Sequence, residues 1–197
     1  MNRLNFFIVL FFLSAAASGQ TVFKINQYNI LHGSTFMPVF TLYTGHSFND
    51  QWGFSAYFYV NGTKGSSWGE GLAGPSWKPA KGLTMSLLAG FQTNEDQLFR
   101  FSPLIIYNNR QFSSFASFEV GGKRHRWDVM AFWLKDSWKV GAELIRFYQL
   151  YAAGPRVELS FLKNQPLTVF LSGLWDWKNS KPAWMFGLYT SFSSLKR

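Results

Sequence analysis

One eight-residue stretch, residues 154–161, constrains the fold more than any other part of the sequence. Side chains in an extended strand point alternately to opposite faces. The even-numbered positions of this stretch carry Arg156, Glu158 and Ser160, and the odd-numbered positions carry Val157, Leu159 and Phe161. An α-helix would mix the two sets around its circumference, whereas a strand separates them. The pattern therefore predicts a strand with one polar face and one strongly apolar face, which is typical of a membrane barrel with a polar lumen.

The same alternation recurs in segments of about ten residues, the length that a tilted membrane strand requires. The clearest are residues 51–60, 82–92, 111–120, 138–147 and 183–192. Short polar breaks with turn residues separate the segments. The prediction is an all-β fold: a transmembrane antiparallel β-barrel of about twelve strands, with short loops on both sides. Residues 20–31 alternate weakly and form either a first strand or an N-terminal tail, and a tail reduces the expected count to about ten.

The first nineteen residues are predicted to be a secretory signal peptide. Arg3 is followed by an unbroken apolar run over residues 6–13, and small residues occupy positions 15–19. An N-terminal membrane anchor is the alternative, but the apolar run is too short to span a bilayer comfortably. We therefore expect residues 1–19 to be removed and residues 20–197 to form a single barrel domain that is exported to the cell outer membrane.

The composition favours a membrane barrel over a soluble sandwich. Charged residues make up 15% of the chain and aromatic residues 20%, so the charge is low for a soluble surface and the ring content high. Six tryptophans fall near expected strand ends, where rings favour the membrane interface and form an aromatic girdle. They are Trp52, Trp77, Trp127, Trp138, Trp175 and Trp184. The absence of cysteine excludes disulfides and thiol catalysis.

The chain resembles the bacterial outer-membrane β-barrel proteins as a class, with no specific subfamily matched. The resemblance covers residues 22–192 and rests on the signal peptide, the strand period and the aromatic final strand. It implies an outer-membrane location and contact with outer-membrane lipid and lipopolysaccharide.

Eight charged residues are predicted to line the lumen, because they alternate with apolar neighbours. They are Glu70, Arg100, Glu119, Asp128, Lys139, Glu143, Arg156 and Glu158. Two interpretations stay open for this set. The charges either select solutes that pass through the lumen, or form a network that pairs buried charges inside a narrow barrel.

Residues 121–126 form the densest basic run and are expected in an outer loop, with Lys123, Arg124 and Arg126 exposed. The chain has a net charge of +9, and basic loops of this kind can contact lipopolysaccharide or attract anions to a channel mouth. An ordinary solvated turn explains the run equally well. Nucleic acid is not expected as a partner, because the run is short and the protein is exported.

The sequence contains little that indicates catalysis. No metal-ligand spacing, phosphate-binding glycine loop or haem motif occurs, so neither a metal nor a cofactor is expected. His32 and Ser34 are the nearest approach to a hydrolase site, with no third member. Three functions remain: a small passive channel for small polar or charged solutes, an accessory barrel in an envelope or secretion complex, and, more remotely, a lipid-modifying hydrolase. We expect a non-enzyme.

Overall fold

The computed structural model describes residues 20–63, 66–93, 98–121, 125–147, 149–161 and 167–193. The predicted signal peptide, residues 1–19, lies outside these ranges, as do Lys123 and Arg124 of the predicted basic loop. Within the described ranges, no helix is long and apolar enough to cross a membrane.

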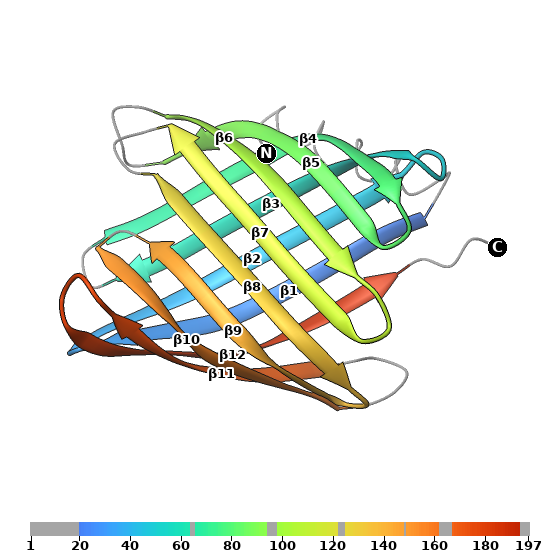
Figure 1. The fold of residues 1–197 in the computed structure, drawn as a ribbon. Helices are drawn as coiled ribbons and strands as arrows, with labels where there is room; N and C mark the ends of the chain where they lie inside the picture. Colours follow the sequence, from blue (N-terminus) through green and yellow to red (C-terminus); the bar gives the residue numbers. More distant parts are fainter. Residues whose placement is uncertain are drawn as a thin grey trace.

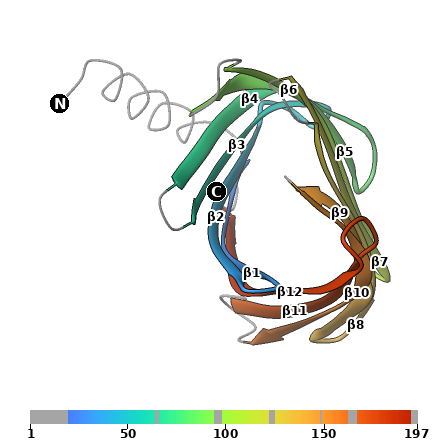
Figure 2. The same ribbon diagram turned by 90° about the vertical axis from the view of Figure 1, so that its left-hand side faces the viewer.

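Twelve antiparallel strands form a closed barrel in which each strand pairs with its neighbours in sequence and β1 pairs with β12 (Figures 1 and 2). The strands are β1 (Gln20–His32), β2 (Thr35–Ser47), β3 (Trp52–Thr63), β4 (Ser66–Ala80), β5 (Leu83–Gln92), β6 (Phe99–Asn108), β7 (Phe112–Gly121), β8 (Arg126–Lys135), β9 (Trp138–Phe147), β10 (Leu150–Phe161), β11 (Leu167–Asp176) and β12 (Lys181–Ser193). The predicted barrel of about twelve strands is confirmed. The segment left open between strand and tail is strand β1, which closes the barrel.

The connections between strands are short, and the conformation of several is fixed by hydrogen bonds within the turn or by a glycine. Asn49 Oδ1 accepts hydrogen bonds from the backbone N–H groups of Gln51 and Trp52, at 2.9 and 2.7 Å, and so closes the β2–β3 turn. Asn109 makes the same contacts at the β6–β7 turn. Gly82, in the two-residue β4–β5 connection, has a φ of +81° that favours glycine. These turns leave each strand antiparallel to the next.

The two faces of the barrel wall differ in chemistry. Apolar side chains such as Leu87, Val140 and Leu171 are exposed on the outside, at 50%, 55% and 50%. Charged side chains such as Glu143 and Arg156 point inward and are buried. Pro103 lies on the outside of β6, where the ladder to β7 is interrupted, because proline has no N–H to donate. The alternation read from the sequence therefore separates an apolar exterior from a polar and aromatic interior.

The apolar side chains on the outside of the barrel are predicted to contact lipid. Leu87 lies midway along β5, so the Leu87→Arg variant should lose about 2–4 kcal/mol of unfolding free energy in lipid vesicles, because a charge would enter the middle of the bilayer. Urea titration followed by tryptophan fluorescence measures the loss, and Leu87→Ala separates lost side-chain size from added charge. A loss no larger than that of Leu87→Ala would show that position 87 does not meet lipid.

Candidate functional site

The barrel has two chemically different ends. We call the end where β1 begins and β12 finishes the terminus end, which lies to the right in Figure 1. The opposite end, which carries the β1–β2 and β11–β12 connections, is the loop end. The interior side chains of the two ends are packed differently, and this difference defines the candidate site.

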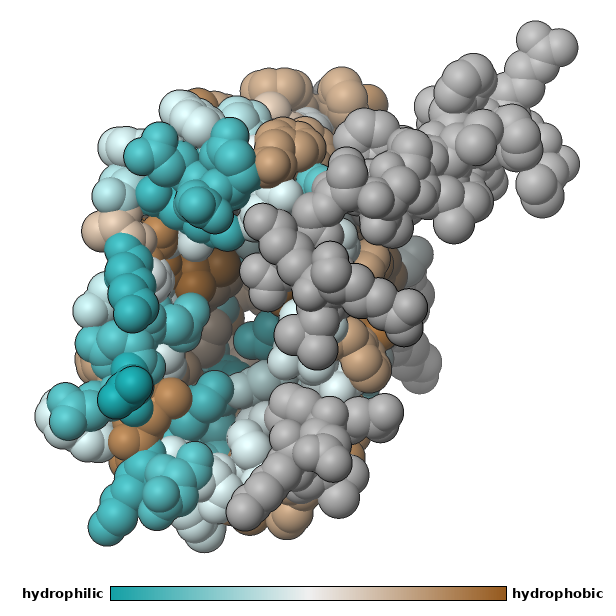
Figure 3. All heavy atoms as spheres, turned by 90° about the vertical axis from the view of Figure 1, so that its right-hand side faces the viewer, coloured by the Kyte–Doolittle hydropathy of each residue, from teal (hydrophilic) through white to brown (hydrophobic). Residues whose placement is uncertain are grey.

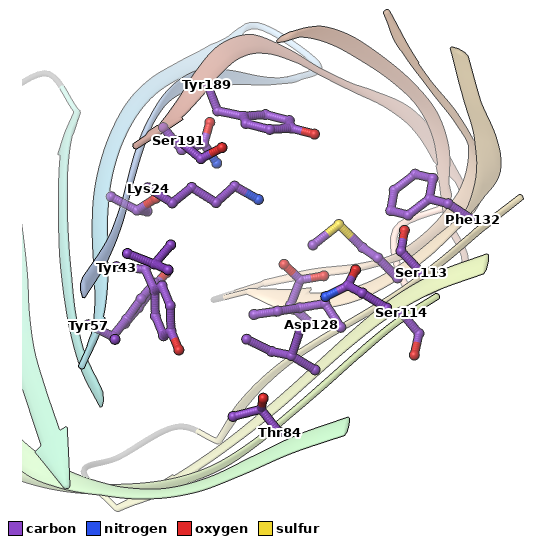
Figure 4. A pocket seen from close by; sticks show the side chains of 18 of the residues that line it. Lys24, Tyr43, Tyr57, Thr84, Ser113, Ser114, Asp128, Phe132, Tyr189 and Ser191 are labelled. Carbon is purple, nitrogen blue, oxygen red and sulfur yellow. The ribbon is translucent and has the colours of Figure 1, made fainter. Parts of the chain in front are cut away.

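A cavity of about 420 Å³, here called the vestibule, occupies the terminus half of the lumen. Figure 3 looks onto this end of the molecule and shows it hollowed. The lining comes mainly from the first half of odd-numbered strands, such as Lys24 and Tyr57, and from the second half of even-numbered strands, such as Lys78. Figure 4 shows Lys24, Tyr43 and Tyr57 facing Asp128 and Phe132 across this space. The vestibule is therefore bounded by charges and aromatic rings together.

One wall of the vestibule is built around Arg156. Its Nε donates to Glu158 Oε1 at 2.9 Å, and its Nη1 lies 3.2 Å from Glu143 Oε2. The guanidinium group also lies 3.7 Å from the ring centroid of Phe170, a cation–π contact. Ser172 Oγ donates to Glu143 Oε2 at 2.6 Å. The buried arginine is thus held by two carboxylates and by the rings of Phe170 and, at 5.8 Å, Phe132.

Lys139 and Tyr189 extend this group, and we call the six residues Lys139, Glu143, Arg156, Glu158, Ser172 and Tyr189 the Arg156 cluster. The Lys139 ammonium lies 3.3 Å from Glu158 Oε2 and donates to the Tyr189 hydroxyl at 2.9 Å. The Tyr189 hydroxyl in turn donates to Glu158 Oε2 at 2.6 Å. The cluster contains two bases and two carboxylates, so this wall of the vestibule is balanced in charge.

A second group surrounds Arg126, deeper toward the loop end. Arg126 Nη2 pairs with Glu70 and with Glu119, the latter at 2.5 Å. Its guanidinium carbon lies 4.5 Å from the Tyr59 ring centroid and 4.9 Å from that of Trp68. We call Arg126, Glu70, Glu119, Tyr59 and Trp68 the Arg126 cluster. The Arg126 cluster borders a small space of about 30 Å³, and Asp128 lines both this space and the vestibule. The lumen therefore narrows sharply at the Arg126 cluster.

Apolar side chains fill the lumen beside the Arg126 cluster, at the loop end. We call them the loop-end core, and they are between 0% and 6% exposed: Ile30, Val39, Tyr59, Trp68, Phe147, Leu150, Ala152, Leu174 and Ala183. Tyr59, Trp68 and Phe147 pack ring against ring, with centroids 5.1–6.4 Å apart. In the terminus half, some interior residues such as Lys24 and Thr84 are only half-buried, and they border the vestibule. The lumen is therefore open at one end and packed at the other.

The eight residues predicted to line the lumen all lie on interior positions of their strands, and the structure groups most of them. Seven of the eight make polar contacts, six of these within the two clusters and the seventh, Arg100, with Gln92 Oε1 at 2.7 Å and the Gly121 carbonyl at 2.6 Å. Asp128 stands apart on the vestibule wall. The paired geometry favours the structural-network interpretation for the two clusters.

Arg126 differs from the sequence prediction. It was expected in the exposed basic loop, but it is the first residue of β8 and pairs with Glu119 across the β7–β8 ladder. Sequence reasoning also missed Lys24 and Lys78, whose side chains line the vestibule. Lys24 alternates along β1 with Asn26 and Tyr28 on the same face, and this pattern could have placed Lys24 in the lumen.

The residues considered for catalysis do not form a triad. His32 Nε2 lies 3.0 Å from Asp176 Oδ2 at the loop end, and among the described residues no hydrogen bond joins His32 to Ser34. Asp176 also accepts hydrogen bonds from the backbone N–H groups of Lys178 and Asn179, which shapes the β11–β12 turn. Across the same described ranges, no three His, Asp or Glu side chains gather as a metal site.

Comparison with solved structures identifies the fold. The KdgM porin is 16% identical, covers 86% of this chain and 99% of its own, and superposes with a TM-score of 0.57. The NanC porin is 9% identical, with 88% and 100% coverage and a TM-score of 0.55. The translocator domain of NalP from Neisseria meningitidis is 10% identical, with 89% and 88% coverage and a TM-score of 0.50.

No protein-family model and no curated protein sequence matches the chain. The structural likeness shows that the chain has the fold of the outer-membrane β-barrels.

Proposed function

We propose that the protein is an outer-membrane channel of low conductance for small polar or charged solutes. The observation that carries this proposal is the vestibule, a cavity of about 420 Å³ lined by charges inside a barrel whose outside is apolar. Solutes enter at the terminus end and meet the Arg126 cluster and the loop-end core further along. If the termini lie in the periplasm, as an even number of strands allows, the vestibule opens there.

The comparisons support a solute channel without identifying its solute. Two of the similar folds are named as porins, and KdgM has also been solved in complex with disordered oligogalacturonate. At these sequence identities, the specificity of this chain rests on its own lining. That lining includes Lys78, whose ammonium donates to Ser47 Oγ at 2.6 Å near the mouth and forms no ion pair among the described residues.

Low conductance follows from the packing of the loop half. Ions and solutes cross a barrel through water, and here buried rings and the paired charges of Arg126, Glu70 and Glu119 occupy that path. Passage then requires these side chains to move. Buried rings and paired charges rearrange more slowly than exposed side chains, so a small and fluctuating current is the expected behaviour.

Planar-bilayer recordings test the channel and its selectivity together. We expect Lys78→Met to shift the reversal potential toward cations, because one fixed positive charge leaves the mouth of the vestibule. Lys81→Met is the matched control: it removes the same charge from the exposed β4–β5 turn, outside the vestibule lining. The shift should shrink at high salt, which screens charge. Equal shifts from both variants would place the selecting charges outside the vestibule.

The packed loop half also favours a second candidate, an accessory barrel subunit of an envelope or secretion complex. Such a barrel needs no open lumen, and the buried ion pairs would then serve stability and specificity of folding. Folded protein that gives no current in the same recordings would favour this second candidate. In either case we propose contact of the exterior with outer-membrane lipid and of basic loop residues with the phosphates of lipopolysaccharide.

A further inference from the structure

Two opposite charges lie inside the vestibule, deeper than Lys78 at its mouth, and neither forms an ion pair among the described residues. They are the Asp128 carboxylate on β8 and the Lys24 ammonium on β1, which face the same space from opposite walls (Figure 4). The Arg156 cluster is balanced in charge, and Glu70, Glu119 and Arg126 of the Arg126 cluster do not line the vestibule. These two groups are therefore the charges that a solute bound inside the vestibule, beyond its mouth, can use.

One oxygen of the Asp128 carboxylate lacks a hydrogen-bond donor. Its Oδ1 is buried and accepts no hydrogen bond from the described residues. Arg126 and Arg156 also point into the lumen, but each is already bonded to two carboxylates. Leaving a buried carboxylate oxygen without a donor is costly. A ligand that brings an ammonium group to this wall would remove that cost.

Lys24 presents the complementary charge. Its ammonium lies 4.1 Å from the ring centroid of Tyr189, and Lys24 forms no ion pair among the described residues. Glu158, the carboxylate on the neighbouring part of the wall, is bonded to Arg156, Lys139 and Tyr189. A carboxylate of the ligand would thus meet an ammonium that forms no direct ion pair with an acid among the described residues.

The space between the two charges suits a flat apolar body. Rings of Tyr43, Tyr57, Phe132 and Tyr189 line it, and its volume of about 420 Å³ lies within the range of small-molecule sites. A simple anion would leave Asp128 unsatisfied, and a simple cation would leave Lys24 unsatisfied. Only a molecule that carries both charges and a ring satisfies the whole lining.

We propose that the vestibule binds a small zwitterion with an aromatic or flat apolar body, of the amino-acid type. Its carboxylate contacts Lys24, its ammonium contacts Asp128, and its ring lies among the aromatic side chains. This proposal rests on the proposed function, because it names the solute class that would use the vestibule. Binding is nevertheless measurable without transport.

Isothermal titration calorimetry of the folded barrel in a non-ionic detergent tests the ligand class, since a zwitterionic detergent could itself fill the site. The probes are tryptophan, tryptamine, which lacks the carboxylate, and indole-3-propionate, which lacks the ammonium. Tryptophan should bind at least about tenfold more tightly than either analogue, because each analogue loses one charge-assisted hydrogen bond. Equal affinities for the three probes, or no heat with tryptophan, would overturn the proposal.

Variants assign each charge to its partner. Asp128→Asn, which keeps the side-chain shape, should weaken tryptophan about tenfold and leave indole-3-propionate unchanged. Lys24→Met should weaken tryptophan similarly and leave tryptamine unchanged, whereas Lys81→Met should alter nothing. Heat-dependent gel mobility confirms that each variant is folded. Unchanged tryptophan affinity in both folded variants would overturn the assignment.

Bilayer recordings on the same preparations separate this proposal from the proposed function. Current without tryptophan binding removes the zwitterion site and leaves the channel. Tryptophan binding without current supports the site and removes the channel.

Discussion

We expect the Arg156→Met variant to lose about 3–5 kcal/mol of unfolding free energy, because it leaves buried carboxylates without their cation. Glu143 is 1% exposed and would keep only the hydrogen bond from Ser172. Glu158 would keep Lys139 and Tyr189, so most of the loss should come from Glu143. Urea unfolding in lipid vesicles, followed by tryptophan fluorescence, measures the change.

Two further variants make this result specific to the buried pair. Adding Glu143→Gln to Arg156→Met removes the orphaned charge and should recover a large part of the lost stability. Arg110→Met removes an arginine from an exposed turn and should change stability by less than about 1 kcal/mol. If Arg156→Met costs no more than Arg110→Met, water must reach the Arg156 cluster freely, and the lumen is wider than the structure shows.

The second large effect concerns conductance. Truncating Phe147 to alanine should raise the single-channel conductance several-fold, because its ring packs against Tyr59 and Trp68 where the loop half of the lumen is filled. Recordings in planar bilayers measure the change directly. Leu150→Ala, in the same core, should act in the same direction, so the test does not depend on one variant folding well.

Phe118→Ala is the matched control, because it removes the same ring from the outside of β7, where Phe118 is 44% exposed. We expect its conductance to equal that of the wild type. Two results would contradict the proposed constriction. A large wild-type conductance that Phe147→Ala leaves unchanged would show that solutes pass elsewhere, and an absence of current in every folded variant would favour the accessory barrel.

The fold could be predicted because its determinant is local. Backbone geometry makes successive side chains in a strand point to opposite sides. The side to which Arg156, Glu158 and Val157 point can therefore be predicted without knowing which strands pair with theirs. The same reasoning placed Glu119 and Glu143 inside. Alternation alone does not decide the first strand, because Asn29 and Gln27 break it, and pairing with both β2 and β12 decides its structure.

The arrangement within the lumen depends on contacts that the sequence does not order. Arg126 was expected in a loop, but the ladder between β7 and β8 extends far enough to pair it with Glu119. The packing of Tyr59 against Phe147 joins β3 to β9, whose depths in the barrel are set by the register of all intervening strands. The closure of the loop half therefore could not be foreseen from alternation alone.

The barrel wall separates lipid from a lumen that is wet at the terminus end and packed at the loop end. Three positions of β9 test this arrangement together, and the chain contains no native cysteine to interfere. In Lys139→Cys, Leu144→Cys and Ile145→Cys, we measure labelling in vesicles by a water-soluble and by a lipid-soluble thiol reagent. Lys139 lines the vestibule, Leu144 is 41% exposed on the outside, and Ile145 is 4% exposed inside.

We expect the water-soluble reagent to label position 139 alone, the lipid-soluble reagent to label position 144, and neither to label position 145 rapidly. Lipid-phase labelling at 145 but not at 144 would show that the two faces are inverted. Aqueous labelling at 145 as fast as at 139 would show that the lumen is open throughout, and would contradict the packed loop half on which the account depends.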